Sequence, residues 1–174
     1  MKDKTIIGRT STANFPEEGI KGVPVKIDTG AHSSSIWASQ LRIDDQATLH
    51  FVLFGIGSPY YSGKVHSTKS YKVRLVRSSN GTTQIRYRVQ LRMVLGGRRV
   101  VTNITLAERS QNLFPVLVGC RTLQNKFLVD VSQGKVEKER FEAQNNVLNA
   151  ELERDPQAFF KKYHMENHRG DITL

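Results

Sequence analysis

The chain has 174 residues, of which 38% are hydrophobic and 24% charged, a composition typical of one globular domain with a short appendage. No stretch approaches the roughly 20 apolar residues of a membrane span, and the N-terminal residues lack the apolar run of a signal peptide. The single cysteine, Cys120, excludes an internal disulfide, so we expect a cytoplasmic protein with no membrane partner.

The net charge of +10 is unevenly distributed along the chain. Residues 46–107 contain ten Lys or Arg and no Asp or Glu, whereas residues 137–174 contain eight acidic and six basic residues. A cationic body favours an anionic partner, and charge alone leaves open whether this is a nucleic acid, a membrane surface or an acidic polypeptide.

Residues 6–136 are predicted to form short strands separated by turns. The first clear strand, Val23–Ile27, ends at the turn Asp28-Thr29-Gly30. Residues 33–41 predict a short strand or a turn segment, and residues 48–54 form an apolar, β-rich run that is closed by glycines and a proline.

The clearest predicted element is a β-hairpin. Apolar residues alternate with mostly cationic ones over 71–76 and again over 84–93, and Asn80-Gly81 between them is typical of a two-residue hairpin turn. A period of two puts the apolar side chains on one face and the cations on the other. We therefore expect one group of cations to project together: Lys72, Arg74, Arg86, Arg88 and Arg92.

A second turn at Gly96-Gly97 leads into a further strand, and two more apolar runs follow at 114–119 and 127–131. After Gly134 the composition changes to Glu, Gln, Asn, Arg and Ala, with apolar residues at loosely helical spacing. Because Asp155-Pro156 is a typical helix start, we predict two short helices in this tail.

The tripeptide Asp28-Thr29-Gly30 is weak evidence by itself, since such sequences are also common turns. Here an apolar strand precedes it, Ala31 follows it, and far downstream the run Val116–Gly119 ends in glycine. Two such segments can present a carboxylate at a turn while the second backbone approaches closely, which requires glycine at Gly30 and Gly119. The Thr29 hydroxyl can hold the carboxylate in place by hydrogen bonds within or across the loops.

This pairing resembles the retropepsin pattern, in which an Asp-Thr-Gly-Ala loop and an apolar-apolar-Gly segment pack around the catalytic aspartate. Most of residues 23–132 is further similar to a bacterial family labelled ATP-dependent zinc protease, better described as retropepsin-like peptidases associated with ATP-grasp peptide ligases. The stretches that carry this similarity are 25–38, 76–81, 106–110 and 114–131. Two positions depart from the family pattern: His32 stands where Lys or Arg is usual, and Trp37 where His is frequent.

The resemblance implies an all-β, retropepsin-like (acid protease) barrel over residues 1–136, with a helical C-terminal extension over 137–174. It implies an aspartic peptidase whose catalytic loop is Asp28, Thr29 and Gly30, with Ala31 in contact with the substrate. The chemistry needs two carboxylates that share a proton. Because the chain has one Asp-Thr-Gly, the implied active form is a homodimer that contributes Asp28 from each copy.

The resemblance also suggests the substrate. ATP-grasp ligases of this association add glutamate residues to proteins, and a glutamate-rich tail would be an anionic peptide. We therefore take Arg86 and Arg88 as candidate substrate-binding residues and expect a peptide or protein substrate that is acidic. Two segments are candidates for a flap over the substrate: the hairpin around Asn80-Gly81 and the loop Gly55–Gly63.

No cofactor or metal is expected, despite the family label. The chain has neither a Walker-type phosphate loop nor a His-Glu-x-x-His motif. We expect His32, His50 and His66 to be surface or structural residues, and Cys120 to be buried and inert.

Two alternatives come from other classes of function. A catalytically inactive barrel of this type would serve as a binding module that regulates a peptide ligase, because a correct loop motif does not establish turnover. A nucleic-acid-binding barrel would suit the basic strands. We disfavour it, because aromatic residues do not interleave with the cations as a base-stacking platform requires.

Overall fold

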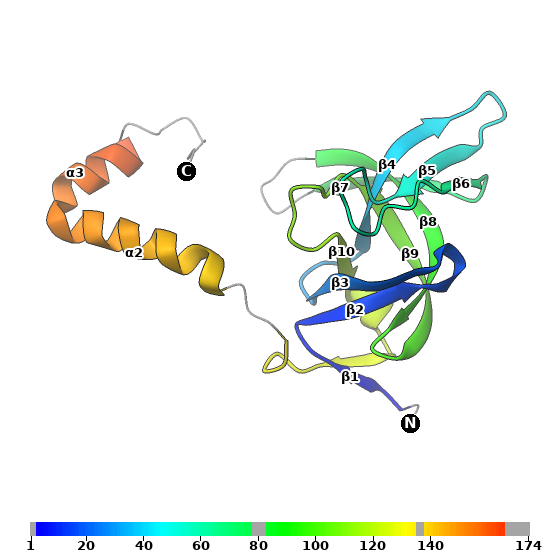
Figure 1. Ribbon diagram of the computed structural model, residues 1–174, viewed down its shortest axis with the longest axis horizontal. Helices are drawn as coiled ribbons and strands as arrows, with labels where there is room; N and C mark the ends of the chain where they lie inside the picture. Colours follow the sequence, from blue (N-terminus) through cyan, green and yellow to red (C-terminus); the bar gives the residue numbers. More distant parts are fainter. Residues whose placement is uncertain (1–2, 78–82, 135–137, 166–174) are drawn as a thin grey trace. The chain divides into compact units, whose positions relative to one another are not determined.

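The computed structural model describes residues 3–77, 83–134 and 138–165, with the backbone alone for 138–141 and 164–165 (Figure 1). The chain divides into two compact units, residues 1–134 and 135–174. The division that we expected, between residues 136 and 137, and the predicted Asn80-Gly81 turn both lie outside the described residues.

The first unit is built almost entirely from strands (Figure 1). In chain order they are β1 (Thr5–Ile7), β2 (Thr10–Phe15), β3 (Ile20–Asp28), β4 (Ser34–Ile43), β5 (Leu49–Leu53), β6 (Val65–Thr68), β7 (Lys72–Arg77), β8 (Thr83–Leu95), β9 (Arg98–Ala107), β10 (Val116–Gly119) and β11 (Phe127–Val129). Two short helical segments accompany them, the 3-10 turn η1 (Pro16–Glu18) and the helix α1 (Cys120–Leu123).

Six of these strands close into a barrel. They pair in the order β10-β3-β2-β8-β9-β4, and β4 pairs back with β10 to complete the ring. β5 and β6 continue the sheet beyond β4, β7 pairs with β8, and β1 and β11 form a separate parallel pair. The predicted all-β, retropepsin-like barrel is confirmed.

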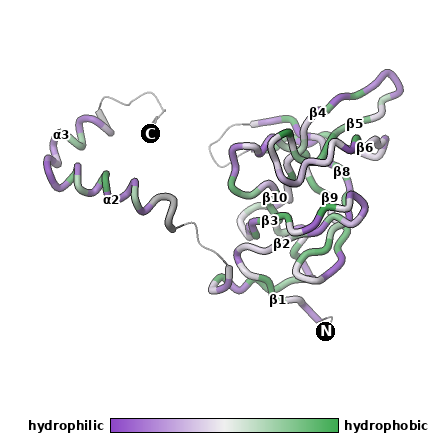
Figure 2. The backbone as a smooth tube through the Cα atoms, in the orientation of Figure 1, coloured by the Kyte–Doolittle hydropathy of each residue, from purple (hydrophilic) through white to green (hydrophobic). Residues whose placement is uncertain are grey.

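Alternate residues of the barrel strands form its core, as the period of two predicts. Val23 and Val25 of β3 are fully buried, as is Leu95 of β8, while their neighbours along each strand are more exposed. Figure 2 shows the same alternation of hydropathy along the strands of the first unit. Burial of each such side chain contributes about 1.5–3 kcal/mol, so this core holds the site's supporting strands in place.

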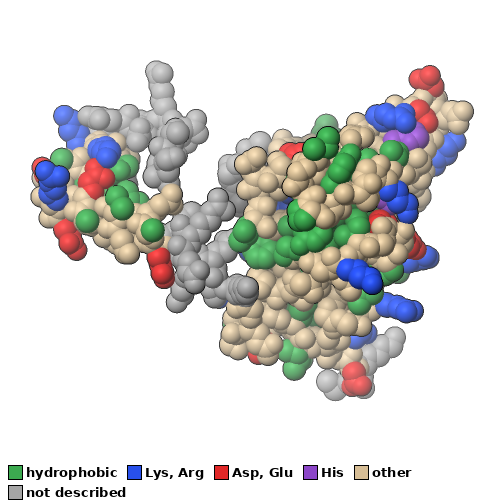
Figure 3. Space-filling model, in the orientation of Figure 1, with side chains coloured by type: hydrophobic (Ala, Val, Ile, Leu, Met, Phe, Trp, Pro, Cys, Tyr) green, Lys and Arg blue, Asp and Glu red, His purple; other side chains and the backbone are tan. Residues whose placement is uncertain are grey.

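The predicted hairpin forms as β7 and β8, but only part of its apolar face is covered. Leu91 near the barrel is 8% exposed, whereas Leu75 and Ile85 in the outer part of the hairpin are 73% and 71% exposed. The reason is length, because β8 pairs with β9 only from Arg88 onward and its first residues extend past the barrel. Apolar side chains are visible on the surface of the first unit in Figure 3.

The second unit contains α2 (Lys138–Arg154), α3 (Pro156–Phe160) and the π-helical turn η2 (Lys161–Met165). The Asp155 side chain caps α3 by accepting hydrogen bonds from the backbone N–H groups of Gln157 and Ala158, as the sequence predicted. None of the described helices is long and apolar enough to cross a membrane. Docking of this tail on the barrel or on a partner chain stays a prediction.

Candidate active site

Asp28 lies where two parallel strands end side by side. It is the last residue of β3, and its register partner on β10 is Gly119. β10 pairs with β3 on one side and with β4 on the other, so the loop 29–33 that joins β3 to β4 crosses the end of β10. The chain therefore wraps the Asp28 loop around a strand that comes much later in the sequence.

The Asp28 carboxylate has one oxygen held by the backbone. Oδ1 accepts hydrogen bonds from the N–H groups of Gly30 and Ala31, both at 3.0 Å. Within the described part of the chain, Oδ2 has no hydrogen-bond partner. Asp28 is half-buried, while Thr29 and Gly30 beside it are exposed. The loop thus holds one carboxylate oxygen and leaves the other without a hydrogen bond from the described residues.

Close packing behind the loop requires glycine at position 119. A Cβ on Gly119 would lie 2.6 Å from the carbonyl oxygen of Ala31 and 2.7 Å from that of Ser33. A Cβ on Gly30 would meet only Asp28 Oδ1, at the ordinary distance of 3.4 Å. We expected close packing to require glycine at both positions. Within one chain the packing requires glycine at position 119 but not at position 30.

A chain of buried hydroxyl groups lies behind the Asp28 loop, at the end of β10. Ser34 Oγ accepts a hydrogen bond from the Gly119 N–H at 3.0 Å and lies 2.6 Å from Thr122 Oγ1, which lies 2.5 Å from Thr102 Oγ1. Thr105 adds a bond from its hydroxyl to the Ser34 carbonyl, at 3.1 Å. These residues join β4, β9 and α1 to the end of β10, and the sequence did not reveal them.

Two expectations about the loop need correction. The Thr29 side chain is exposed, and among the described residues its hydroxyl has no hydrogen-bond partner, so it does not hold Asp28 within one chain. Cys120 is half-exposed rather than buried, and its thiol donates a hydrogen bond of 2.8 Å to the Thr29 carbonyl. The thiol occupies the first turn of α1, which brings it to the Asp28 loop.

Arg109, a residue that the sequence analysis did not single out, lies near the Asp28 loop. Its guanidinium donates to the Phe114 carbonyl at 3.1 Å and to Ser35 Oγ at 3.2 Å. Burial lowers the pKa of Arg109, nearby Arg86 lowers this pKa further, and Asp28 raises it. Arg109 is thus within electrostatic range of both the candidate catalytic carboxylate and the cationic hairpin.

The hairpin cations gather at this end of the barrel. Arg74 lies directly opposite Arg86 in the β7–β8 register, and Lys72 lies opposite Arg88. Burial lowers the pKa of Arg88, and Arg74 and Arg121 of α1 lower it further. Five arginines form what we call the arginine cluster: Arg74, Arg86, Arg88, Arg109 and Arg121. Within the described residues, none of the five forms an ion pair.

Arg92, which we expected to project with these cations, does not belong to the arginine cluster. Its guanidinium forms an ion pair of 2.7 Å with Glu17 of η1. The acid comes from outside the stretch 46–107 that lacks Asp and Glu, so the pattern along the hairpin alone could not predict this pairing.

With this geometry in view, comparison with known proteins assigns the family. The RimB-like family model, described as retropepsin-like aspartic endopeptidase RimB, matches residues 6–140. The chain belongs to this RimB-like family. The match covers the barrel, including the Asp28 loop, Arg109 and the end of β10.

Curated relatives of this RimB-like chain are larger proteins. The chain is 31% identical over 134 residues to a protein of Shewanella pealeana named probable alpha-L-glutamate ligase, and 24% identical over 143 residues to one of the same name from Desulfotalea psychrophila. These matches cover 75% and 78% of this chain but only 29% and 31% of the relatives. A crystal structure of a Legionella pneumophila protein of unknown function shares the fold, with a TM-score of 0.54, 21% identity, and coverage of 75% of this chain and 96% of that one.

The histidines of the RimB-like barrel lie at different places. His32 is exposed, and His50 bonds Asp44 Oδ2 at 2.9 Å and Ser67 Oγ at 2.8 Å. His66 stacks on Phe51, with ring centroids 5.2 Å apart. These contacts confirm structural roles for His50 and His66. Among the described residues, no group of three His, Cys, Asp or Glu side chains is placed to hold a metal ion.

The loop Gly55–Gly63, one of the two flap candidates, is tied to the barrel. Tyr60 donates a hydrogen bond to the Gly22 carbonyl at 3.3 Å, and Lys64 next to the loop donates to the Glu17 carbonyl at 2.8 Å. At its start, a Cβ on Gly55 would lie 2.6 Å from the Trp37 ring, so the loop backbone rests directly on that ring. Contacts on three sides hold this loop against the barrel.

Proposed function

We propose that this RimB-like protein is an aspartic endopeptidase that hydrolyses peptide bonds with a pair of Asp28 carboxylates, one from each copy of a homodimer. The observation that carries the proposal is the Asp28 loop, where the backbone holds Oδ1 and leaves Oδ2 open. Thr29 and Gly30 are exposed beside it, so a second copy can approach the carboxylate.

The pair of carboxylates would perform acid–base catalysis. Two carboxylates about 3 Å apart cannot both ionise, so they share one proton. The ionised carboxylate takes a proton from a water molecule as its oxygen attacks the peptide carbonyl carbon, and the protonated carboxyl gives its proton to the carbonyl oxygen. In this scheme the exposed Thr29 hydroxyl is free to bond the partner's loop, and Ala31 lines the substrate path.

The β7–β8 hairpin is the better candidate for the flap over the substrate. Its arginines Arg86 and Arg88 lie within electrostatic range of Arg109 and Arg121 beside the Asp28 loop. The alternative loop, Gly55–Gly63, is tied to Gly22 by the Tyr60 hydrogen bond. A substrate between hairpin and loop would therefore contact the arginine cluster, including the proposed substrate-binding residues Arg86 and Arg88.

We infer that the substrates are acidic, glutamate-rich polypeptides. Five arginines without ion pairs in the described chain repel one another unless an anion binds among them. The curated relatives are named probable alpha-L-glutamate ligases, and this chain corresponds to less than a third of each. The co-occurrence of a similar segment with a glutamate-adding activity in one polypeptide supports a glutamate-rich substrate here.

The decisive test is Asp28→Asn, which is nearly isosteric and should fold normally but lose all proteolysis of a glutamate-rich peptide. Wild-type activity should be blocked by a statine-type inhibitor and be unaffected by EDTA. Activity that survives in Asp28→Asn and disappears with EDTA would overturn the aspartic mechanism. Absence of turnover in a dimer that still binds the peptide would instead identify a binding module.

The substrate class needs its own test. Arg86→Glu/Arg88→Glu should abolish the preference for a glutamate-rich peptide over a neutral one of equal length, and raising salt should weaken that preference in the wild type, since exposed charges are screened over roughly 8–10 Å. Lys21→Glu/Arg99→Glu makes the same charge change at exposed positions outside the arginine cluster and is the control. Equal cleavage of both peptides by the wild type would contradict the acidic substrate.

A further inference from the structure

Two strands of the barrel lose their common neighbour close to the candidate site. β9 lies between β8 and β4, and its pairing ends at Thr105 opposite Arg88 and at Ala107 opposite Trp37. Beyond that end, residues 83–87 of β8 pair only with β7, and residues 38–43 of β4 pair only with β5 and Phe54, as far as the described chain shows. Each strand therefore presents an unpaired backbone edge where β9 would have continued.

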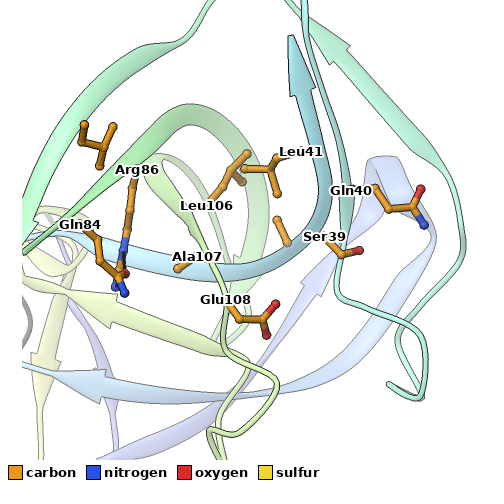
Figure 4. Close-up of a pocket in the computed structure, with 10 residues that line it drawn as sticks. Ser39, Gln40, Leu41, Gln84, Arg86, Leu106, Ala107 and Glu108 are labelled. Carbon is orange, nitrogen blue, oxygen red and sulfur yellow. Dashed lines mark hydrogen bonds between the residues drawn. The ribbon is translucent and has the colours of Figure 1, made fainter. Parts of the chain in front are cut away.

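An open cleft of about 540 Å³ occupies this gap (Figure 4). Its lining comes from Ala38–Leu41 of β4, Gln84–Arg86 of β8 and Leu106–Glu108 at the end of β9. Figure 4 shows Leu41 and Leu106 between the strand that carries Ser39 and the strand that carries Arg86. The cleft thus has apolar side chains between two strand edges.

A bulge in β4 lies at the same place. Gln40 has a φ of 54°, in the left-handed region that non-glycine residues rarely adopt, and the β4–β5 register shifts between Ser39 and Arg42. The Gln40 side chain donates a hydrogen bond of 3.0 Å to the Tyr61 hydroxyl. Because a bulge bends its strand, β4 turns just where it parts from β9. Strain of this kind is typical of functional positions.

We propose that this cleft binds an extended acidic peptide as an added strand in line with β9, an inference that rests on the proposed function for the acidity of the peptide. An unpaired strand edge is a ready template for another chain, and here two edges face one gap. Main-chain groups of the peptide would bond to residues 38–43 on one side and 83–87 on the other. Substrate would then be held over a long stretch, away from the bond that is cut.

The charges at the cleft set the direction of the acidic side chains. Arg86 lines one wall, and among the described residues its Nε and Nη2 atoms bond the Gln84 amide oxygen alone. Arg74 lies opposite it on β7. Glu108, an acid in the lining, is kept ionised by a hydrogen bond with Ser110 that lowers its pKa. Peptide carboxylates would therefore point toward Arg86, and their methylene groups would cover the exposed side chain of Leu41.

The test uses the full chain with Asp28→Asn, so that a labelled glutamate-rich peptide binds without being cut. Leu41→Glu places a negative charge, like that of the peptide, in the cleft and should weaken binding about tenfold. Leu128→Glu makes the same change at an exposed leucine of β11, outside the cleft and its two strand edges, and should change binding less than about twofold. Hydrogen exchange should slow at the amides of residues 38–43 and 83–87 when the peptide binds.

Equal effects of the two substitutions, or protection confined to the Asp28 loop, would overturn the inference. If Leu41→Glu instead dissociates a dimer in sedimentation while leaving peptide affinity unchanged, the cleft pairs two copies of the chain and the proposal fails. Cleavage by the wild type is measured in parallel. Cleavage without protection of the two strand edges would support the proposed peptidase function and overturn the cleft proposal. Protection of the edges without cleavage would support peptide binding in the cleft and overturn the peptidase function.

Discussion

The Asp28 loop and the outer β7–β8 hairpin differ in where their side chains find partners. Behind the loop, the hydroxyls of Ser34 and Thr122 are buried and bonded to one another within the chain. On the hairpin, Arg74 faces Arg86 across the strands, and Leu75 on the other face is 73% exposed. The packing behind the loop is complete within one chain, whereas the hairpin carries both charge and apolar surface that a bound molecule would satisfy. Buried, hydrogen-bonded packing and exposed charge are thus separated in the fold.

The largest expected effect on stability is in the packed region behind the Asp28 loop. Gly119→Ala would push a methyl group into the carbonyls of Ala31 and Ser33, and overpacking of this kind costs about 1–3 kcal/mol or more. We expect a clear loss of stability in denaturant titrations together with lost activity. Gly30→Ala, which meets only an ordinary contact, should leave stability nearly unchanged. Equal destabilisation by both would contradict the proposed role of close packing.

Removal of one buried hydroxyl group should lower the free energy of unfolding by less than Gly119→Ala does. Thr122→Val keeps the shape of the side chain but leaves Ser34 and Thr102 without their shared partner, at about 1–3 kcal/mol. Thr83→Val makes the same change at an exposed position of the hairpin and should cost no more than about 0.5 kcal/mol. If the two variants unfold at the same denaturant concentration, the hydroxyl chain does not support the loop.

Removal of a hairpin cation should stabilise the free protein slightly. Arg74→Gln relieves a like-charge pair with Arg86 and should raise the free energy of unfolding by about 0.2–1 kcal/mol at low salt, while weakening acidic-peptide binding. Arg77→Gln, opposite Thr83, removes the same charge without such a pair and is the control. A loss of stability in Arg74→Gln would contradict the repulsion between Arg74 and Arg86.

The smallest effect concerns a third place, the β4–β5 turn, where the partly exposed Asp44 has its hydrogen-bond partners inside the chain. Hydrogen bonds, the largest from His50, lower the pKa of Asp44 from 3.8 to about 2. Its contribution to stability should be fully present above about pH 4 and be lost as the pH falls through about 2. Thermal melts of the wild type and Asp44→Asn should converge over that range. A constant difference between them at every pH would contradict this.

What the sequence could predict was local. Asp28, Gly119 and the Asp155 cap each belong to short motifs whose geometry depends on adjacent residues. The Ser34–Thr122 bond joins residues 88 positions apart, so no pattern in one segment could reveal it. Alternation gave the faces of the hairpin correctly but could not tell which face is covered, because Leu91 and Leu75 obey the same period and differ from 8% to 73% exposure.

Arg109 and Gln40 were missed for another reason. Arg109 lay within a stretch that resembled the family, but its role depends on β9 ending beside the Asp28 loop, which is a property of the barrel. The left-handed Gln40 breaks the usual preference for glycine or asparagine at such positions, so residue type gave no signal.

The insertion of β10 between β3 and β4 has a consequence for the order of folding. Asp28 and its register partner Gly119 are far apart in sequence, and the loop 29–33 has nothing to wrap around until β10 is in place. Contacts of such long range are slow to form, because the chain must close a large loop before it gains their energy. A nascent chain that ends before Val116 therefore carries the Asp-Thr-Gly sequence before its carboxylate can be positioned against β10.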